Sequence, residues 1–199
     1  MHHPSFASTQ NPLPRFGSRR LHHLGVTLVE LLIVLAVFGA LVSYAVPSFS
    51  LVIRSVRLTA AANAYLSSML RARSEAIKRS GRVVLCKTAD GMTCSATGGW
   101  EQGWIVFHDI NNNGDHDPGE FVIERMGPLS AGLRLSGNSP VANYVSFSAT
   151  GGTKLVGGGF QAGTLTLCNE STASGFGRQI ILNAVGRPRL HTLNLRSCG

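Results

Sequence analysis

Residues 25–47 read GVTLVELLIVLAVFGALVSYAVP, an apolar run that contains a single charged side chain, Glu30. The run is long enough to cross a bilayer as a helix, which takes about 20 apolar residues. A carboxylate at the centre of a spanning helix costs about 2.5–3.5 kcal/mol on insertion scales, and such residues usually serve a function. The run therefore predicts an N-terminal membrane helix in which Glu30 has a role.

The segment that precedes this run is short and basic. It carries Arg15, Arg19 and Arg20 and ends at Gly25. Arginines on this side predict that the segment faces the cytoplasm. An ordinary secretory signal is cut after its apolar core. A cut at Gly25 would instead lie before the core, so the apolar run would stay on the mature protein.

This arrangement resembles the class III signal of type IV pilins and pseudopilins. The resemblance implies that a prepilin peptidase cuts between Gly25 and Val26 and that the new N-terminus is methylated. The glutamate at position 5 of the mature family sequence is then Glu30, and the family's proline is Pro47. Val26 departs from the usual phenylalanine, although the family tolerates other apolar residues there.

The resemblance also implies a location and partners. The chain would reside in the bacterial inner membrane with its globular part in the periplasm, and then in a pilus with other major and minor pilins. In the fibre, Glu30 would pair with the methylated amine of a neighbour, and two opposite charges are buried together more cheaply than one alone. The alternative is a plain N-terminal membrane anchor.

Charge is unevenly distributed along the 199 residues. Lys and Arg number 18 against 10 Asp and Glu, a formal net charge of +8. From Met126 onward there is one acid, Glu170, and the basic residues are Arg134, Lys154, Arg178, Arg187, Arg189 and Arg196. A basic C-terminal half favours an acidic partner such as nucleic acid or anionic lipid.

The four cysteines are Cys86, Cys94, Cys168 and Cys198. An even count in an exported domain predicts two disulfides. We prefer Cys86–Cys94 and Cys168–Cys198 among the three possible connectivities. Zinc is a weak alternative, because there is no Cys-x-x-Cys motif and no histidine pair near the cysteines. We expect no metal and no cofactor.

The helix is expected to continue beyond Pro47 as an amphipathic helix to about residue 81. Apolar residues recur there at three- and four-residue steps, which indicates one buried stripe: Leu58, Ala62, Tyr65, Met69, Ala72 and Ala76. Most of the basic residues in this segment lie off the stripe, and Gly81 is a natural helix stop.

After Gly81 the pattern changes to alternating residues separated by glycine- and asparagine-rich breaks, which predicts strands. The expected strands are residues 82–86, 103–108, 120–125, 132–136, 144–149, 164–168, 178–185 and 189–195. A helix followed by an antiparallel sheet is an α+β fold. The expected segments are a leader (1–25), a membrane or fibre-core helix (26–47), its amphipathic continuation (48–81) and a β-rich globular domain (82–199).

A short basic turn connects the last two expected strands. Gly186 permits a tight turn, Pro188 stiffens it, and Arg187 and Arg189 would be presented together. Guanidinium groups match phosphate oxygens and stack on bases. Arg178 and Arg196 would widen the positive surface. The alternative is an ordinary basic hairpin turn.

The motif Gly186-Arg187-x-Arg189 near the C-terminus resembles the FimT group of minor type IV pilins, which bind DNA in natural transformation. Residues 103–111 also resemble the GspH/FimT family. The resemblance implies non-specific DNA binding for uptake. The alternatives are a minor pseudopilin of type II secretion, of the GspH type, or a minor pilin that only primes pilus assembly.

The loop of residues 109–120 places oxygen-bearing side chains at the spacing of a calcium-binding EF-hand loop, with Gly114 at the sixth position. Its flanks read as strands, so an EF-hand is excluded, and Asn, Asp and Gly are also common in hairpin turns. We favour a plain turn, and the alternative is a loop that binds a structural calcium ion. An enzyme is the least expected class, because His108, His116 and His191 have no recognisable partner spacing.

Overall fold

The computed structural model describes residues 25–170, 175–195 and 198, with only the backbone of residues 44–48, 50 and 51. The chain divides into two compact units, Met1–Ala45 and Val46–Gly199. One helix, α1 (Leu28–Arg79, 52 residues), contributes to both units. We describe each unit by itself.

In the first unit, α1 begins after Thr27. The hydroxyl of Thr27 accepts a hydrogen bond from the Glu30 N–H (3.2 Å), which satisfies one of the free donors of the first turn. The large apolar side chains from Val26 to Val42 are 40–74% exposed, on all sides of the helix. Within the described residues, no helix meets the length and hydropathy criteria for a membrane span.

In the second unit, α1 supplies the centre of the core. All six side chains of the predicted stripe are buried, and five of them are fully inaccessible. Tyr65 forms edge-to-face contacts with Trp100 (5.1 Å between centroids) and Trp104 (5.0 Å). The helix ends where Ser80 adopts a positive φ of 51° and the Gly81 N–H bonds to Ala76 O at 3.2 Å, next to the predicted stop.

Eight strands follow the helix: β1 (Arg82–Lys87), β2 (Trp104–Asp109), β3 (Val122–Met126), β4 (Leu133–Gly137), β5 (Tyr144–Phe147), β6 (Gly163–Asn169), β7 (Gly175–Leu182) and β8 (Pro188–Leu195). Each overlaps one of the strands expected from the sequence. Two short 3-10 helices, Trp100–Gln102 and Ser139–Val141, were not predicted. The predicted α+β class is confirmed.

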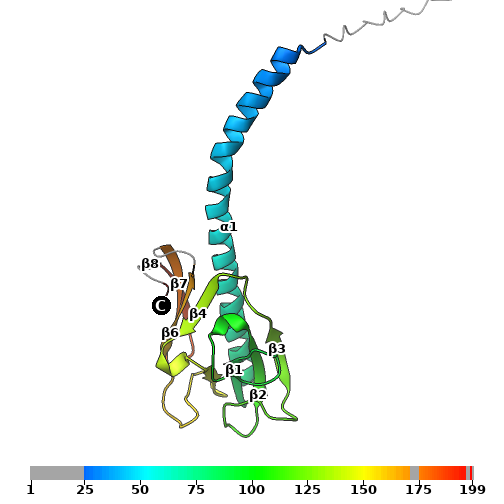
Figure 1. The fold of residues 1–199 in the computed structure, drawn as a ribbon. Helices are drawn as coiled ribbons and strands as arrows, with labels where there is room; N and C mark the ends of the chain where they lie inside the picture. The colour runs from blue at the N-terminus through cyan, green and yellow to red at the C-terminus, as the bar shows by residue number, and fades with distance from the viewer. Residues whose placement is uncertain (1–24, 171–174, 196–197, 199) are drawn as a thin grey trace, which may run out of the picture. The chain divides into compact units, whose positions relative to one another are not determined.

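The strands form two antiparallel four-stranded sheets rather than one. The orders are β3-β2-β1-β5 and β4-β6-β7-β8, and both sheets lie against the second-unit part of α1 (Figure 1). One core cluster joins that part of α1 to side chains of both sheets. A smaller cluster on the other face of the first sheet contains Val84, Cys86, Ile105 and Phe107.

Candidate nucleic-acid interface

The predicted basic turn joins β7 to β8, and we call residues 183–189 the arginine turn. The last paired residues of the two strands are Leu182 and Pro188. The Gly186 N–H donates to Asn183 O and the Arg187 N–H donates to Asn183 Oδ1, each at 2.9 Å. Backbone donors of the turn are therefore satisfied inside the turn itself.

The arginine turn does not project freely but is packed on the loop that follows β5. Gly186 has a φ of 73° and lies so close to Gly151 that an added Cβ would be 2.0 Å from Gly151 O. The Thr153 N–H donates to Ala184 O (3.1 Å), and the Thr153 hydroxyl lies 3.0 Å from Asn183 O. Only glycine at position 186 allows this approach of two backbones.

Arg187 and Arg189 are both exposed. Within the described part of the chain, neither side chain forms an ion pair or a hydrogen bond, and β7, β8 and the turn between them contain no acidic residue. Two neighbouring guanidinium groups are thus left with their charge uncompensated. Such groups attract phosphate oxygens and donate to them in a forked geometry.

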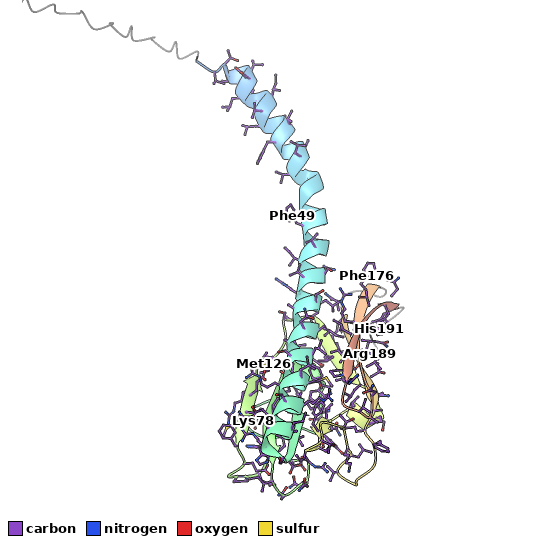
Figure 2. All side chains as sticks on the ribbon, turned by 180° about the vertical axis from the view of Figure 1, so that it is seen from behind. Phe49, Lys78, Met126, Phe176, Arg189 and His191 are labelled. Carbon is purple, nitrogen blue, oxygen red and sulfur yellow. A yellow bond between two sulfur atoms is a disulfide. The ribbon has the colours of Figure 1, made fainter. Side chains whose placement is uncertain are left out.

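The register of β8 places Arg189 on the outer face of its sheet. Arg189 is opposite Ile181, which is 38% exposed, whereas the next residue, Leu190, is opposite the buried Ile180. Because side chains alternate between faces, His191 lies on the same face as Arg189, and Figure 2 shows the two side by side on β8. Arg189 and His191 are both exposed, so this part of the face is open to solvent.

Arg178 does not widen this surface. It shares the inner face of β7 with Ile180, and its Nη2 donates to Thr59 Oγ1 of α1 at 3.1 Å. Arg196 lies outside the described residues. The structure therefore leaves Arg187 and Arg189 exposed at the arginine turn, whereas Arg178 lies against α1.

One basic residue near the turn was missed by the sequence analysis. Arg73 of α1 lines the same pocket as Arg187, together with Phe160 and Val185. The sequence showed only that Arg73 lies off the apolar stripe of its helix. Nothing in the sequence relates it to a turn more than 100 residues later.

The two disulfides join the pairs that the sequence favoured. Cys86 is bonded to Cys94 and Cys168 to Cys198, with Cα separations of 5.5 and 5.7 Å. The second bond ties the chain end to β6, two strands in from the edge strand β8. Within the described residues there is no free cysteine.

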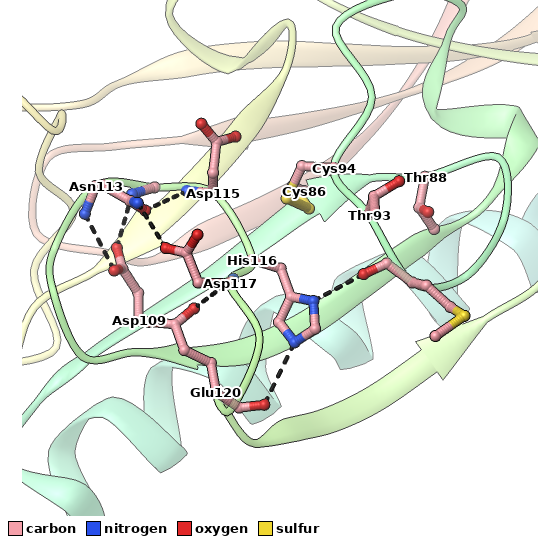
Figure 3. The surroundings of a disulfide bond; sticks show 12 residues. Cys86, Thr88, Thr93, Cys94, Asp109, Asn113, Asp115, His116, Asp117 and Glu120 are labelled. Carbon is pink, nitrogen blue, oxygen red and sulfur yellow. Dashed lines mark hydrogen bonds between the residues drawn. A yellow bond between two sulfur atoms is a disulfide. The ribbon is translucent and has the colours of Figure 1, made fainter.

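We call residues 109–120 the acidic loop. The carboxylates of Asp109, Asp117 and Glu120 face hydrogen-bond donors of the loop itself, whereas that of Asp115 points away (Figure 3). Asp109 is 1% exposed and accepts from the backbone N–H groups of Asn113 (3.1 Å) and Gly114 (2.9 Å). Glu120 accepts from the backbone N–H groups of Ile110 (2.7 Å) and Asp117 (3.1 Å). Within the described residues, no three His, Cys, Asp or Glu side chains are grouped as metal ligands.

Two acids of this loop have pKa values shifted in opposite directions, one by burial and one by hydrogen bonds. Burial raises the pKa of Asp109, an effect that the Gly114 N–H partly opposes. The side-chain amides of Asn111 and Asn113 lower the pKa of Asp117 by hydrogen bonding to its carboxylate. Amide groups of the loop itself therefore solvate three of its carboxylates, as in a self-contained hairpin turn.

Comparison with known proteins matches two segments of the chain. Residues 61–186 match the family described as Type II transport protein GspH, and residues 20–46 match the prokaryotic N-terminal methylation motif. The methylation motif implies a membrane-anchored protein associated with a pilus.

Two known proteins are similar to this chain over most of their length. The chain is 32% identical to the pilin-like protein PilA1 of Thermus thermophilus over 170 residues, which cover 83% of this chain and 97% of that protein. It resembles the crystal structure of the type IV minor pilin FimU of Pseudomonas aeruginosa with a TM-score of 0.55 and 20% identity, over 71% of this chain and 95% of that chain. The second likeness supports the fold.

Proposed function

The chain belongs to the GspH family of minor type IV pilins and pseudopilins, and from this premise we propose that it binds DNA through the arginine turn during uptake in natural transformation. The observation that carries the proposal is the pair of exposed guanidinium groups at Arg187 and Arg189, which have no partner among the residues that the structure describes. They are held on a turn fixed by the contact of Gly186 with Gly151. Preorganised groups lose little freedom when they bind.

Phosphate contacts supply affinity with little sequence preference. Two arginines neutralise about two phosphates, so one subunit binds weakly, and affinity should fall about tenfold between 50 and 200 mM salt. Weak binding suits uptake, because DNA that is drawn toward the cell envelope by a retracting pilus must afterwards be released.

The test is a gel shift with the full chain in detergent micelles. We expect Arg187→Gln combined with Arg189→Gln to abolish the shift of duplex DNA and to leave the circular dichroism spectrum unchanged. Undiminished binding by this variant would remove the arginine turn from the mechanism. A wild-type chain that fails to shift DNA even at low salt would refute DNA binding altogether.

We also propose the assembly steps that the methylation motif suggests. A prepilin peptidase would remove residues 1–25 by cutting between Gly25 and Val26, residues 26–47 would anchor the chain in the inner membrane, and Glu30 would pair with the methylated terminus of a neighbouring pilin. Mass spectrometry of the chain produced with a prepilin peptidase should show the loss of residues 1–25 and the gain of one methyl group. An unprocessed chain would contradict this step.

The description of the matched family, Type II transport protein GspH, favours a second candidate, a minor pseudopilin of type II secretion. Deletion of the gene separates the candidates. Loss of transformation with normal secretion and twitching supports DNA uptake, loss of secretion supports the pseudopilin, and loss of twitching supports a role in priming fibre assembly.

A further inference from the structure

An open pocket of about 560 Å³ lies beside the arginine turn. Arg187 lines it from the turn, Arg73 from α1, Thr150 and Gly152 from the loop after β5, and Phe160 from the segment before β6. Pockets of this volume hold small ligands of the size of a nucleotide. We call it the Phe160 pocket.

Two guanidinium groups in this pocket lack partners. Arg187 is exposed without an ion pair or side-chain hydrogen bond in the described part of the chain. The Nε of Arg73 is buried, and no described group accepts a hydrogen bond from it. A buried donor without an acceptor is uncommon and needs an explanation. The pocket thus offers cationic groups from two separate elements to one anion.

The pocket also exposes a large aromatic side chain. Phe160 is 78% exposed, and Val185, across the same pocket, is 59% exposed. Phe160 closes a tight hairpin in which Lys154 bridges to Phe160 and the Leu155 N–H donates to Gly159 O at 2.8 Å. Its ring therefore sits on an ordered backbone and presents a surface on which a planar apolar group can stack.

Thr153 fixes the aromatic and cationic sides of the pocket relative to each other. Its hydroxyl lies 2.6 Å from Gln161 O and 3.0 Å from Asn183 O, so the residue after Phe160 and the start of the arginine turn share one hydroxyl. Gln161 is itself buried, and its Nε2 donates to Tyr144 O at 2.9 Å. The pocket is thus preorganised by buried hydrogen bonds.

We propose that the Phe160 pocket binds an unpaired nucleotide, with its base stacked on Phe160 and its phosphate between Arg73 and Arg187, so that the chain prefers single-stranded DNA or frayed DNA ends over duplex. This inference rests on the proposed DNA binding and adds the strand state of the ligand. The bases of a duplex are stacked on one another and do not offer a free face, whereas every unpaired base does.

The test compares a single-stranded oligonucleotide with a duplex of equal phosphate count, by fluorescence anisotropy with the full chain in micelles. Phe160→Ala should weaken single-strand binding by about tenfold, the loss expected for one base–aromatic contact, and change duplex binding by less than about twofold. Phe176→Ala is the matched control. Phe176 is likewise exposed (71%), but it lies at the end of β7 that is far from the arginine turn (Figure 2). It should change neither affinity.

A second variant keeps the stacking surface and reports on it. Phe160→Trp should retain single-strand affinity and show quenched indole fluorescence when an unpaired base stacks on it. Equal binding of both DNA forms by the wild type, or single-strand binding that Phe160→Ala leaves intact, would overturn the pocket and leave duplex binding by the arginine turn standing. A wild type that binds neither form would overturn both proposals.

Discussion

The acidic loop and the arginine turn are both polar hairpin connections, but they treat their charged side chains differently. In the acidic loop, the carboxylates of Asp109 and Glu120 accept hydrogen bonds from backbone N–H groups, so the charges hold the loop together. In the arginine turn, the backbone is satisfied by Asn183, while Arg187 and Arg189 are left without partners among the described residues. A turn that is stable without its charged side chains can use those charges for binding.

The largest effect in this comparison is expected from Gly186→Ala. A Cβ at position 186 collides with Gly151 O, and the backbone there has a φ of 73°, so both strain and overpacking result. We expect a loss of about 3 kcal/mol in the free energy of unfolding, together with weakened DNA binding as the turn leaves its loop. Urea unfolding and anisotropy measure the two effects. Gly119→Ala is the matched control, because Gly119 also has a positive φ (97°) but an added Cβ there contacts nothing, so this variant should show the backbone strain without the collision.

The next largest effects are expected at two arginines that lie on opposite faces of the β7–β8 hairpin. Arg189→Gln should weaken duplex binding several-fold and leave the free energy of unfolding within about 0.5 kcal/mol of wild type. Arg178→Gln should leave DNA affinity unchanged and cost about 1 kcal/mol, because the contact to Thr59 is lost. Equal losses of DNA affinity in both variants would show that binding depends on net charge and not on the exposed face.

In the acidic loop the effects should be on stability alone. Asp109→Ala leaves the N–H groups of Asn113 and Gly114 without acceptors and should lower the free energy of unfolding by about 2 kcal/mol. The exposed Asp115→Ala should be neutral. DNA affinity should be unchanged in both variants. A drop in DNA affinity for Asp109→Ala would show that the acidic loop and the arginine turn are coupled, contrary to our expectation.

The smallest effect is expected in how the stability of the fold depends on acidic pH. The pKa of Asp117 is lowered in the folded state by hydrogen bonds from Asn111 and Asn113, so its contribution to stability is present above its unfolded pKa and is lost as the pH falls through its folded pKa. Asp117→Asn should therefore flatten the decline of thermal stability below about pH 4.

The sequence was sufficient to predict those elements whose buried face follows a regular hydrophobic period. The six stripe residues of α1 are all buried, and each expected strand is present, because periods of 3.6 and 2 record which face meets the core. The face of β7 on which Arg178 lies could not be predicted from such a period. The apolar residues Ile180, Ile181 and Leu182 follow it without alternation, so either register of β7 fits the pattern.

The sequence was insufficient where distant segments meet. The contact of Gly186 with Gly151, the link made by Thr153, and the position of Arg73 beside Arg187 all join parts of the chain that no local pattern relates. Each depends on how the loop after β5 packs against the β7–β8 hairpin. The two arginines of the turn are exposed, as a turn suggests, but the backbone contacts that hold the turn in place could not be foreseen.

The apolar side chains that surround α1 from Val26 to Val42 affect how easily this part of the helix could move from lipid into a fibre of other subunits. Lipid tails and the helices of other subunits are equally apolar, so either one removes the same surface from water. Hydrophobicity alone would then give little preference for one surrounding over the other. The choice would fall to the one ionisable group in that stretch, Glu30, which gains from a cationic partner that hydrocarbon does not contain.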